Sequence, residues 1–120
     1  MELRHRVYIC GAYEGTTLAA TLTNMRRGLS LGYRVLRAGY APFVPWLDWT
    51  LSLIGPVKRE EYLAYSMAWL EVAEAVLVVR QGADTSRGTQ AEIARAEKLG
   101  IPVFRSPEVM EAYFRLEANE

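Results

Sequence analysis

The stretch "AVLVVRQGADTSRGTQAEIARAEKLGIPVF", residues 75–104, contains the pattern that decides the fold. Its first five residues are continuously apolar, which is typical of a parallel strand covered on both faces. A loop of small and polar residues follows, then a helical pattern over 89–99 that Gly100 closes, and then the apolar run 101–104. This order predicts a strand–helix–strand unit with parallel strands.

The same alternation covers the rest of the chain. The segment 6–10 reads as a buried strand, and 40–45 as an extended segment that Pro42 and Pro45 keep out of a helix. Helical stripes are predicted from Met25, Leu29, Gly32, Tyr33 and Leu36 before a stop at Gly39, from Tyr62, Tyr65, Trp69 and Val72 in a helix that begins near Lys58, and over 107–117 with Pro107 in the first turn. We therefore expect one domain over residues 1–120, an α/β three-layer sandwich with a four- to five-stranded parallel sheet.

Composition argues against several classes of function. The formal net charge of the 120 residues is zero, which argues weakly against binding to a nucleic-acid backbone. Arg26, Arg27, Arg34 and Arg37 lie close together, and their spacing favours a solvated helix face over a basic patch. No apolar run reaches membrane-spanning length, and the charged segment 1–6 leads directly into a strand, so neither a membrane span nor a signal peptide is predicted. Cys10 is the single cysteine and no Cys/His cluster has metal-binding spacing. We expect a cytoplasmic protein without a metal or cofactor.

Two interpretations compete for the loop after residue 79. Thr89 to Glu92 has the pattern of a capping box, in which the glutamate closes the first turn of a helix. Alternatively, Glu92 stands at the mouth of the sheet as an ionised carboxylate, available as a nucleophile or general base. Ser86 and Gly88 are compatible with an ordinary turn, or with a hydroxyl and an open backbone that contact a phosphate or sugar.

Further candidates follow the first and second strands. The segment "GAYEG", 11–15, is glycine-rich but lacks a complete dinucleotide-binding fingerprint, so alone it suggests only a small phosphate or ribose site. Tyr8 and Tyr13 suit either the core or a pocket wall, with the core favoured for Tyr8. Trp46, Asp48 and Trp49 come just beyond the second strand, where aromatic rings can stack on a base, cover the sheet edge or form a subunit contact.

Taken together, these segments resemble the nucleoside 2-deoxyribosyltransferase-like superfamily, particularly its small uncharacterised, often phage-encoded members and the related deoxynucleotide N-glycosidases. The resemblance covers nearly the whole chain and is carried by "VYICGAY" at 7–13, "NMRRGLSLGYRVLRAGYAPFVP" at 24–45, "YSMAWLEVAEAVLVV" at 65–79 and "SRGTQAEIARAEKLGIPVF" at 86–104. It implies a flavodoxin-like, Rossmann-like strand order. It also implies a small-molecule nucleoside or nucleotide ligand and a homodimer or larger homo-oligomer.

The resemblance also assigns roles to residues. Glu92 would attack the anomeric carbon of a deoxyribosyl group, the base would leave, and water or a second base would resolve the glycosyl-enzyme. Tyr8 would orient Glu92. The substrate would contact residues that share positions with the family's binding loops, namely Gly11, Ala12, Tyr13, Trp46, Asp48, Ser66, Ser86, Gly88 and Thr89.

Two positions depart from the family pattern, and the first of them bears on catalysis. Many relatives carry an aspartate where this chain has Ser66, and another just before the third strand, where this chain has Glu74. The aspartate assists sugar binding or protonation of the leaving base, and Asp48 is a candidate replacement. The sequence therefore leaves two functions open: an N-glycosidase or deoxyribosyltransferase, and a nucleotide-binding module of the same fold without turnover.

Overall fold

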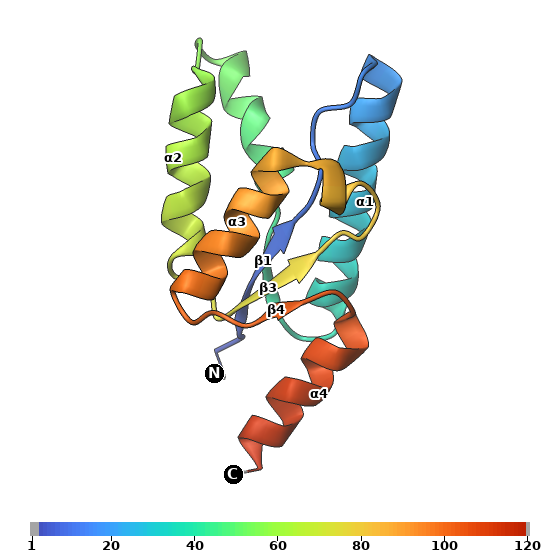
Figure 1. Ribbon diagram of the computed structural model, residues 1–120, viewed down its shortest axis with the longest axis vertical. Coiled ribbons are helices and arrows are strands. Elements are labelled where there is room, and N and C mark those ends of the chain that lie inside the picture. Colours follow the sequence, from blue (N-terminus) through green and yellow to red (C-terminus); the bar gives the residue numbers. More distant parts are fainter. Residues whose placement is uncertain (1–2, 120) are drawn as a thin grey trace.

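A parallel β-sheet forms the centre of the computed structural model, which describes residues 3–119 and, for residues 47–49, the backbone alone. Within these residues the sheet has four strands: β1 (Arg6–Cys10), β2 (Ala41–Phe43), β3 (Ala75–Val78) and β4 (Val103–Phe104). They lie in the order β2-β1-β3-β4, and every pair is parallel (Figure 1). The predicted α/β sandwich with flavodoxin-like strand order is confirmed.

Helices cover both faces of this sheet. The helices α1 (Leu18–Arg37) and α4 (Pro107–Ala118) pack on one face, and α2 (Arg59–Leu70) and α3 (Arg87–Lys98) lie together on the other (Figure 1). Two 3₁₀ segments, η1 (Pro45–Leu53) and η2 (Ala83–Thr85), extend the connections after β2 and β3. The predicted stops after α1 and α3 are confirmed, because Gly39 and Gly100 have φ angles of 101° and 76°, which favour glycine.

The alternation of side chains along β1 divides the core into two layers. Val7 and Ile9 belong to the cluster under α1 and α4, whereas Tyr8 and Cys10 belong to the cluster under α2 and α3. All four side chains are buried. Because Ile93 of α3 packs into the second cluster, the strand delivers Tyr8 and Cys10 to the side of the sheet on which Glu92 lies.

The predicted buried face of α1 is correct for Gly32, which is buried, and for Met25, which packs against the core, but wrong for the other three residues. Leu29, Tyr33 and Leu36 are exposed, and the fully buried residues are Gly28, Gly32 and Val35. The reason is close packing rather than apolar contact. A Cβ on Gly28 would come within 2.9 Å of the Trp46 ring, and one on Gly32 within 2.6 Å of Val44, so the two glycines let α1 approach the sheet.

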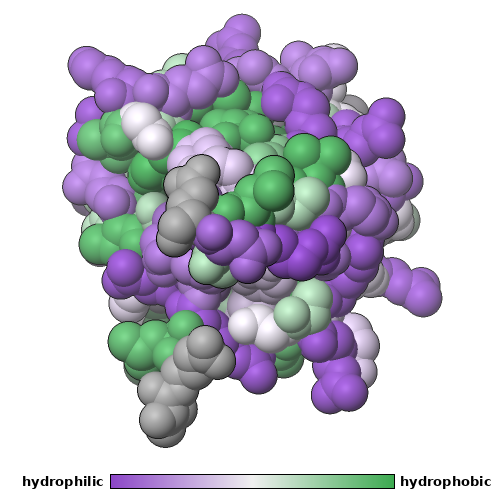
Figure 2. All heavy atoms as spheres, turned by 90° about the horizontal axis from the view of Figure 1, so that it is seen from below, coloured by the Kyte–Doolittle hydropathy of each residue, from purple (hydrophilic) through white to green (hydrophobic). Residues whose placement is uncertain are grey.

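The aromatic stripe of α2 is only partly covered. Tyr65 and Trp69 are 37% and 48% exposed, although the Trp69 ring stacks on Phe43 of β2. Val72, predicted on the same helical stripe, lies beyond the end of α2 and is 46% exposed. At the end of the molecule that carries both termini, hydrophilic side chains are interspersed with smaller apolar groups (Figure 2). Among the described residues, no helix is long and apolar enough to cross a membrane.

Candidate active site

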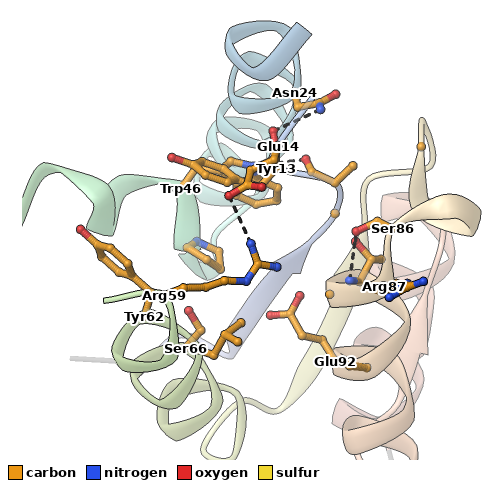
Figure 3. Close-up of a pocket in the computed structure, with 18 of the residues that line it drawn as sticks. Tyr13, Glu14, Asn24, Trp46, Arg59, Tyr62, Ser66, Ser86, Arg87 and Glu92 are labelled. Carbon is orange, nitrogen blue, oxygen red and sulfur yellow. Dashed lines mark hydrogen bonds and ion pairs between the residues drawn. The ribbon is translucent and has the colours of Figure 1, made fainter. Parts of the chain in front are cut away.

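A pocket of about 1070 Å³ opens where β1 and β3 end. Its walls come from the loop after β1, the start of η1, the helix α2 and the first turns of α3 (Figure 3). This is the edge at which open parallel sheets bind ligands. Nine predicted site residues line the pocket: Gly11, Ala12, Tyr13, Trp46, Ser66, Ser86, Gly88, Thr89 and Glu92. Tyr8 is buried in the layer beneath, and the side chain of Asp48 lies outside the described residues.

Glu92 points into this pocket from the second turn of α3 (Figure 3). Both of its carboxylate oxygens have a donor from β1. The Tyr8 hydroxyl donates to Oε2, and the Cys10 Sγ lies 3.5 Å from Oε1. The carboxylate is thus held in one orientation by two side chains of the neighbouring strand.

The capping-box interpretation of Thr89 and Glu92 is wrong. The helix begins earlier, with Ser86 as the N-cap, and Ser86 Oγ accepts from the Thr89 backbone N–H at 3.2 Å. The Thr89 hydroxyl, itself buried, donates to the same oxygen at 2.9 Å. Because serine caps helices better than threonine, the first turn closes on Ser86. Glu92 is therefore one turn inside the helix, where its side chain reaches Tyr8.

Tyr8 and Ser66 form the next part of this network. Burial, and then the charge of Glu92, raise the pKa of the Tyr8 phenol far above its ordinary value. Tyr8 therefore remains a neutral donor toward the carboxylate. The Ser66 hydroxyl of α2 hydrogen-bonds the Tyr8 side chain and acts in the opposite direction on that pKa. Ser66 thus supports the tyrosine that holds Glu92.

The loop after β1 is held by side-chain contacts from two neighbouring elements. The Trp46 indole N–H donates to the Ala12 carbonyl at 3.3 Å, and the Asn24 amide donates to the Tyr13 carbonyl at 3.2 Å. A Cβ on Gly11 would lie 2.7 Å from Val79, so packing accounts for this glycine. Trp46 is only 3% exposed, and anchoring the loop is thus one structural role of its ring.

An ion pair spans the mouth of the pocket. Arg59, the first residue of α2, places Nη1 3.3 Å from Oε1 of Glu14 in the loop after β1 (Figure 3). Both side chains are about two-thirds exposed, at 68% and 67%, so the pair adds little stability. It does bring a cation and an anion to one pocket. Sequence reasoning missed both residues, since nothing local in the sequence shows that α2 faces this loop.

Glu74 lies away from this site. It precedes β3 at the amino-terminal edge of the sheet, where its carboxylate accepts from the Arg6 backbone N–H and lies 3.0 Å from the His5 ring. Among the described residues, no group of three or more His, Cys, Asp or Glu side chains is arranged to hold a metal ion.

The fold and the pocket define a single-sheet, flavodoxin-like α/β protein with a carboxylate held at the carboxyl edge of the sheet. A family model described as "Domain of unknown function (DUF7768)" matches residues 5–106, and the chain belongs to that family. No curated protein matches the chain with significant similarity.

Proposed function

We propose that this protein cleaves the N-glycosidic bond of a nucleoside or nucleoside 5′-monophosphate, with Glu92 as the nucleophile. The observation that carries the proposal is the arrangement of Glu92: a carboxylate in a large pocket at the ligand-binding edge of the sheet, with donors on both oxygens. A nucleophile benefits from such an arrangement because its orientation is set before the substrate binds. The resemblance of the surrounding segments to deoxyribosyltransferase-like proteins supplies the reaction type.

The reaction would proceed in two steps. A Glu92 oxygen attacks C1′ of the sugar, a C–O bond forms, and the C1′–N bond breaks with its electron pair passing to the base. Water, or the nitrogen of a second base, then attacks C1′, and Glu92 leaves as a carboxylate. Water would make the protein a hydrolase and a second base would make it a transferase.

The other pocket residues would bind and orient the substrate. The start of α3 provides the Ser86 hydroxyl and the backbone N–H groups of Arg87 and Gly88 for a sugar hydroxyl or phosphate. The buried Thr89 hydroxyl, which donates to Ser86 Oγ, would keep that serine in place. Arg87 adds positive charge to the pocket wall, which would favour a 5′-phosphate, whereas the charge of Arg59 is compensated by Glu14. Gly11, Ala12, Tyr13 and Trp46 would contact the sugar and base from the opposite wall.

A second candidate is a nucleotide-binding module without turnover. The observation that favours it is Ser66, whose hydroxyl engages Tyr8 where relatives carry an acidic residue. The carboxylates that line the described pocket are those of Glu14 and Glu92. Glu14 is paired with Arg59. Protonation of the leaving base would then depend on Asp48 or on solvent.

The proposal includes a cytoplasmic location and a homodimer or larger homo-oligomer. Support for assembly comes from apolar side chains that remain exposed beside the pocket. Leu53 and Ile54 in and after η1 are 74% and 93% exposed, and Leu63 of α2, which also lines the pocket, is 48% exposed. A second copy of the chain would cover such a surface.

Base release tests the proposal. Wild type, Glu92→Gln and Glu92→Ala are incubated with deoxynucleosides and their monophosphates, with and without a second base, and free base is followed by chromatography. We expect release by wild type and a loss of at least about 10³-fold in both variants. Dependence on the added base would identify a transferase. If no substrate is cleaved while nucleotides still raise the Tm, the binding module is supported instead.

A further inference from the structure

Cys10 is a buried residue that takes no part in the proposed reaction steps. It is the last residue of β1, is fully buried, and lies opposite Val78 of β3 in the sheet register. Its sulfur has two acceptors, Glu92 Oε1 at 3.5 Å and the Thr89 carbonyl at 3.7 Å, both on α3. A cysteine that served only as a small apolar core residue would need neither contact.

We propose that Cys10 is a positioning residue for Glu92, whose thiol donates a hydrogen bond to Oε1 while Tyr8 donates to Oε2. This inference rests on the proposed function of Glu92 and extends it to a residue that does not line the pocket. The two donors approach different oxygens of one carboxylate, so together they restrict rotation of the carboxylate plane.

The protonation state of the thiol is compatible with this role. Burial, followed by the charge of Glu92, raises the pKa of Cys10 well above its ordinary value, although the charge of Arg105 opposes this. Cys10 is therefore a neutral donor. The other charged or titratable side chains that face Glu92 or share its pocket are Tyr8 beneath it and Tyr13, Glu14, Arg59, Tyr62 and Arg87 in the walls.

A thiol suits a carboxylate that must change charge. When a Glu92 oxygen forms the bond to C1′, the carboxylate becomes a neutral ester and accepts hydrogen bonds less strongly. A thiol is a weak donor, so little is lost when its contact with Oε1 weakens. The Thr89 carbonyl then offers a second acceptor to the same S–H without movement of the backbone. Cys10 would thus hold the reactant carboxylate without opposing the intermediate.

The test measures the titration of the Glu92 carboxyl group in the resting protein. Wild type, Cys10→Ala, Cys10→Ser and Val78→Ala are labelled with ¹³C at the glutamate carboxyls, and the Glu92 signal is assigned from its absence in Glu92→Gln. Loss of a donor destabilises the charged form, so Cys10→Ala should raise the midpoint by about half a pH unit. Cys10→Ser keeps a donor and should restore the wild-type midpoint.

Val78→Ala is the matched control, because Val78 is the register partner of Cys10 in the same buried layer and carries no polar atom. It should lower stability without moving the midpoint. An unchanged midpoint in Cys10→Ala, or an equal shift in Val78→Ala, would overturn the proposal and leave Cys10 as a packing residue. In an active enzyme the acid limb of the pH–rate profile should move by the same amount.

A second measurement applies even if Cys10→Ala does not fold, and it requires no catalysis. The chain has one cysteine, so its infrared spectrum has one S–H stretching band. That band should shift as Glu92 titrates and should move to higher frequency in Glu92→Ala. An S–H frequency that stays the same when Glu92 titrates and in Glu92→Ala would contradict the proposal. Failure of base release with a responsive band would reject the glycosidase reaction but keep the Cys10–Glu92 contact.

Discussion

The Glu92 side chain shows how a single residue acquires its role from a different element. Its carboxylate contacts Tyr8 and Cys10, which both lie on β1 and not on its own helix. Both residues alternate with the core residues Val7 and Ile9, so the two-residue period of a strand places them on one face. The orientation of Glu92 is therefore a consequence of sheet packing as much as of its local motif.

Substitution of two glycines at the pocket can distinguish a role in packing from a role in ligand binding. An added Cβ at Gly11 would lie 2.7 Å from Val79, whereas at Gly88 it would meet nothing within 4 Å. We predict that Gly11→Ala lowers the free energy of unfolding by about 1–3 kcal/mol. Gly88→Ala should leave stability equal or raise it by about 0.5 kcal/mol, because alanine favours a helix.

The same pair should differ in substrate binding. If a substrate approaches the backbone of α3, Gly88→Ala raises KM or Kd by about tenfold while the Tm is maintained. Thermal unfolding and nucleotide titration of both variants check this. Unchanged binding in Gly88→Ala would place the substrate elsewhere in the pocket.

At the residue scale, the sequence predicts the motif but not its partners. Ser86, Gly88 and Glu92 are visible as a cluster within one loop and helix start. The capping-box alternative could not be excluded locally, because T-x-x-E satisfies that pattern wherever the helix begins. Cys10 and Glu92 are separated by 82 positions in the sequence, and Glu14 and Arg59 by 45 positions. No local pattern reveals contacts over such separations.

At the scale of elements, Glu74 links two strands at the amino-terminal edge of the sheet. Its carboxylate joins the start of β3 to the start of β1 through Arg6 and His5. Desolvation raises the pKa of Glu74, but the hydrogen bonds from Arg6 and His5 outweigh it, so the pKa is lower than its ordinary value. A carboxyl group with a depressed folded-state pKa stabilises the protein at neutral pH and loses that contribution in acid.

We therefore predict that Glu74→Gln destabilises the protein by about 1 kcal/mol at pH 7, a modest value because the carboxylate is partly exposed. The difference from wild type should shrink as the pH falls from the ordinary glutamate pKa through the lower folded-state value. Denaturant unfolding at several pH values measures this. A difference that stays constant from pH 7 to pH 3 would contradict the assignment.

The elements themselves were largely predictable. Each strand lies within a predicted segment, and the helix stops at Gly39 and Gly100 follow from a conformation that glycine adopts readily. The buried face of α1 was only partly predictable from apolar spacing. The predicted stripe included Gly32 but missed Gly28, because hydrophobic periodicity does not identify a glycine that lets the helix approach a neighbouring ring such as Trp46.

At the scale of the whole molecule, the proposed assembly gives a direct test. Leu53, Ile54 and Leu63 are exposed beside the pocket, and a dimer interface there would bury them. We predict that the protein sediments as a dimer or larger assembly, and that Leu63→Asp shifts it toward the monomer. Leu116→Asp, at a 69% exposed residue of α4, serves as the control and should leave the assembly unchanged. A monomeric wild type at micromolar concentration would reject this part of the proposal.

The mass of the protein during turnover shows directly whether Glu92 is the nucleophile. Wild type and Glu92→Gln are mixed with a cleavable deoxynucleoside or its monophosphate, quenched in acid and analysed by intact-protein and peptide mass spectrometry. We expect a deoxyribosyl adduct at Glu92 of the wild type and none on Glu92→Gln. The adduct should carry a 5′-phosphate if the substrate does. An adduct on another residue, or full turnover by Glu92→Gln, would contradict the proposed role of Glu92.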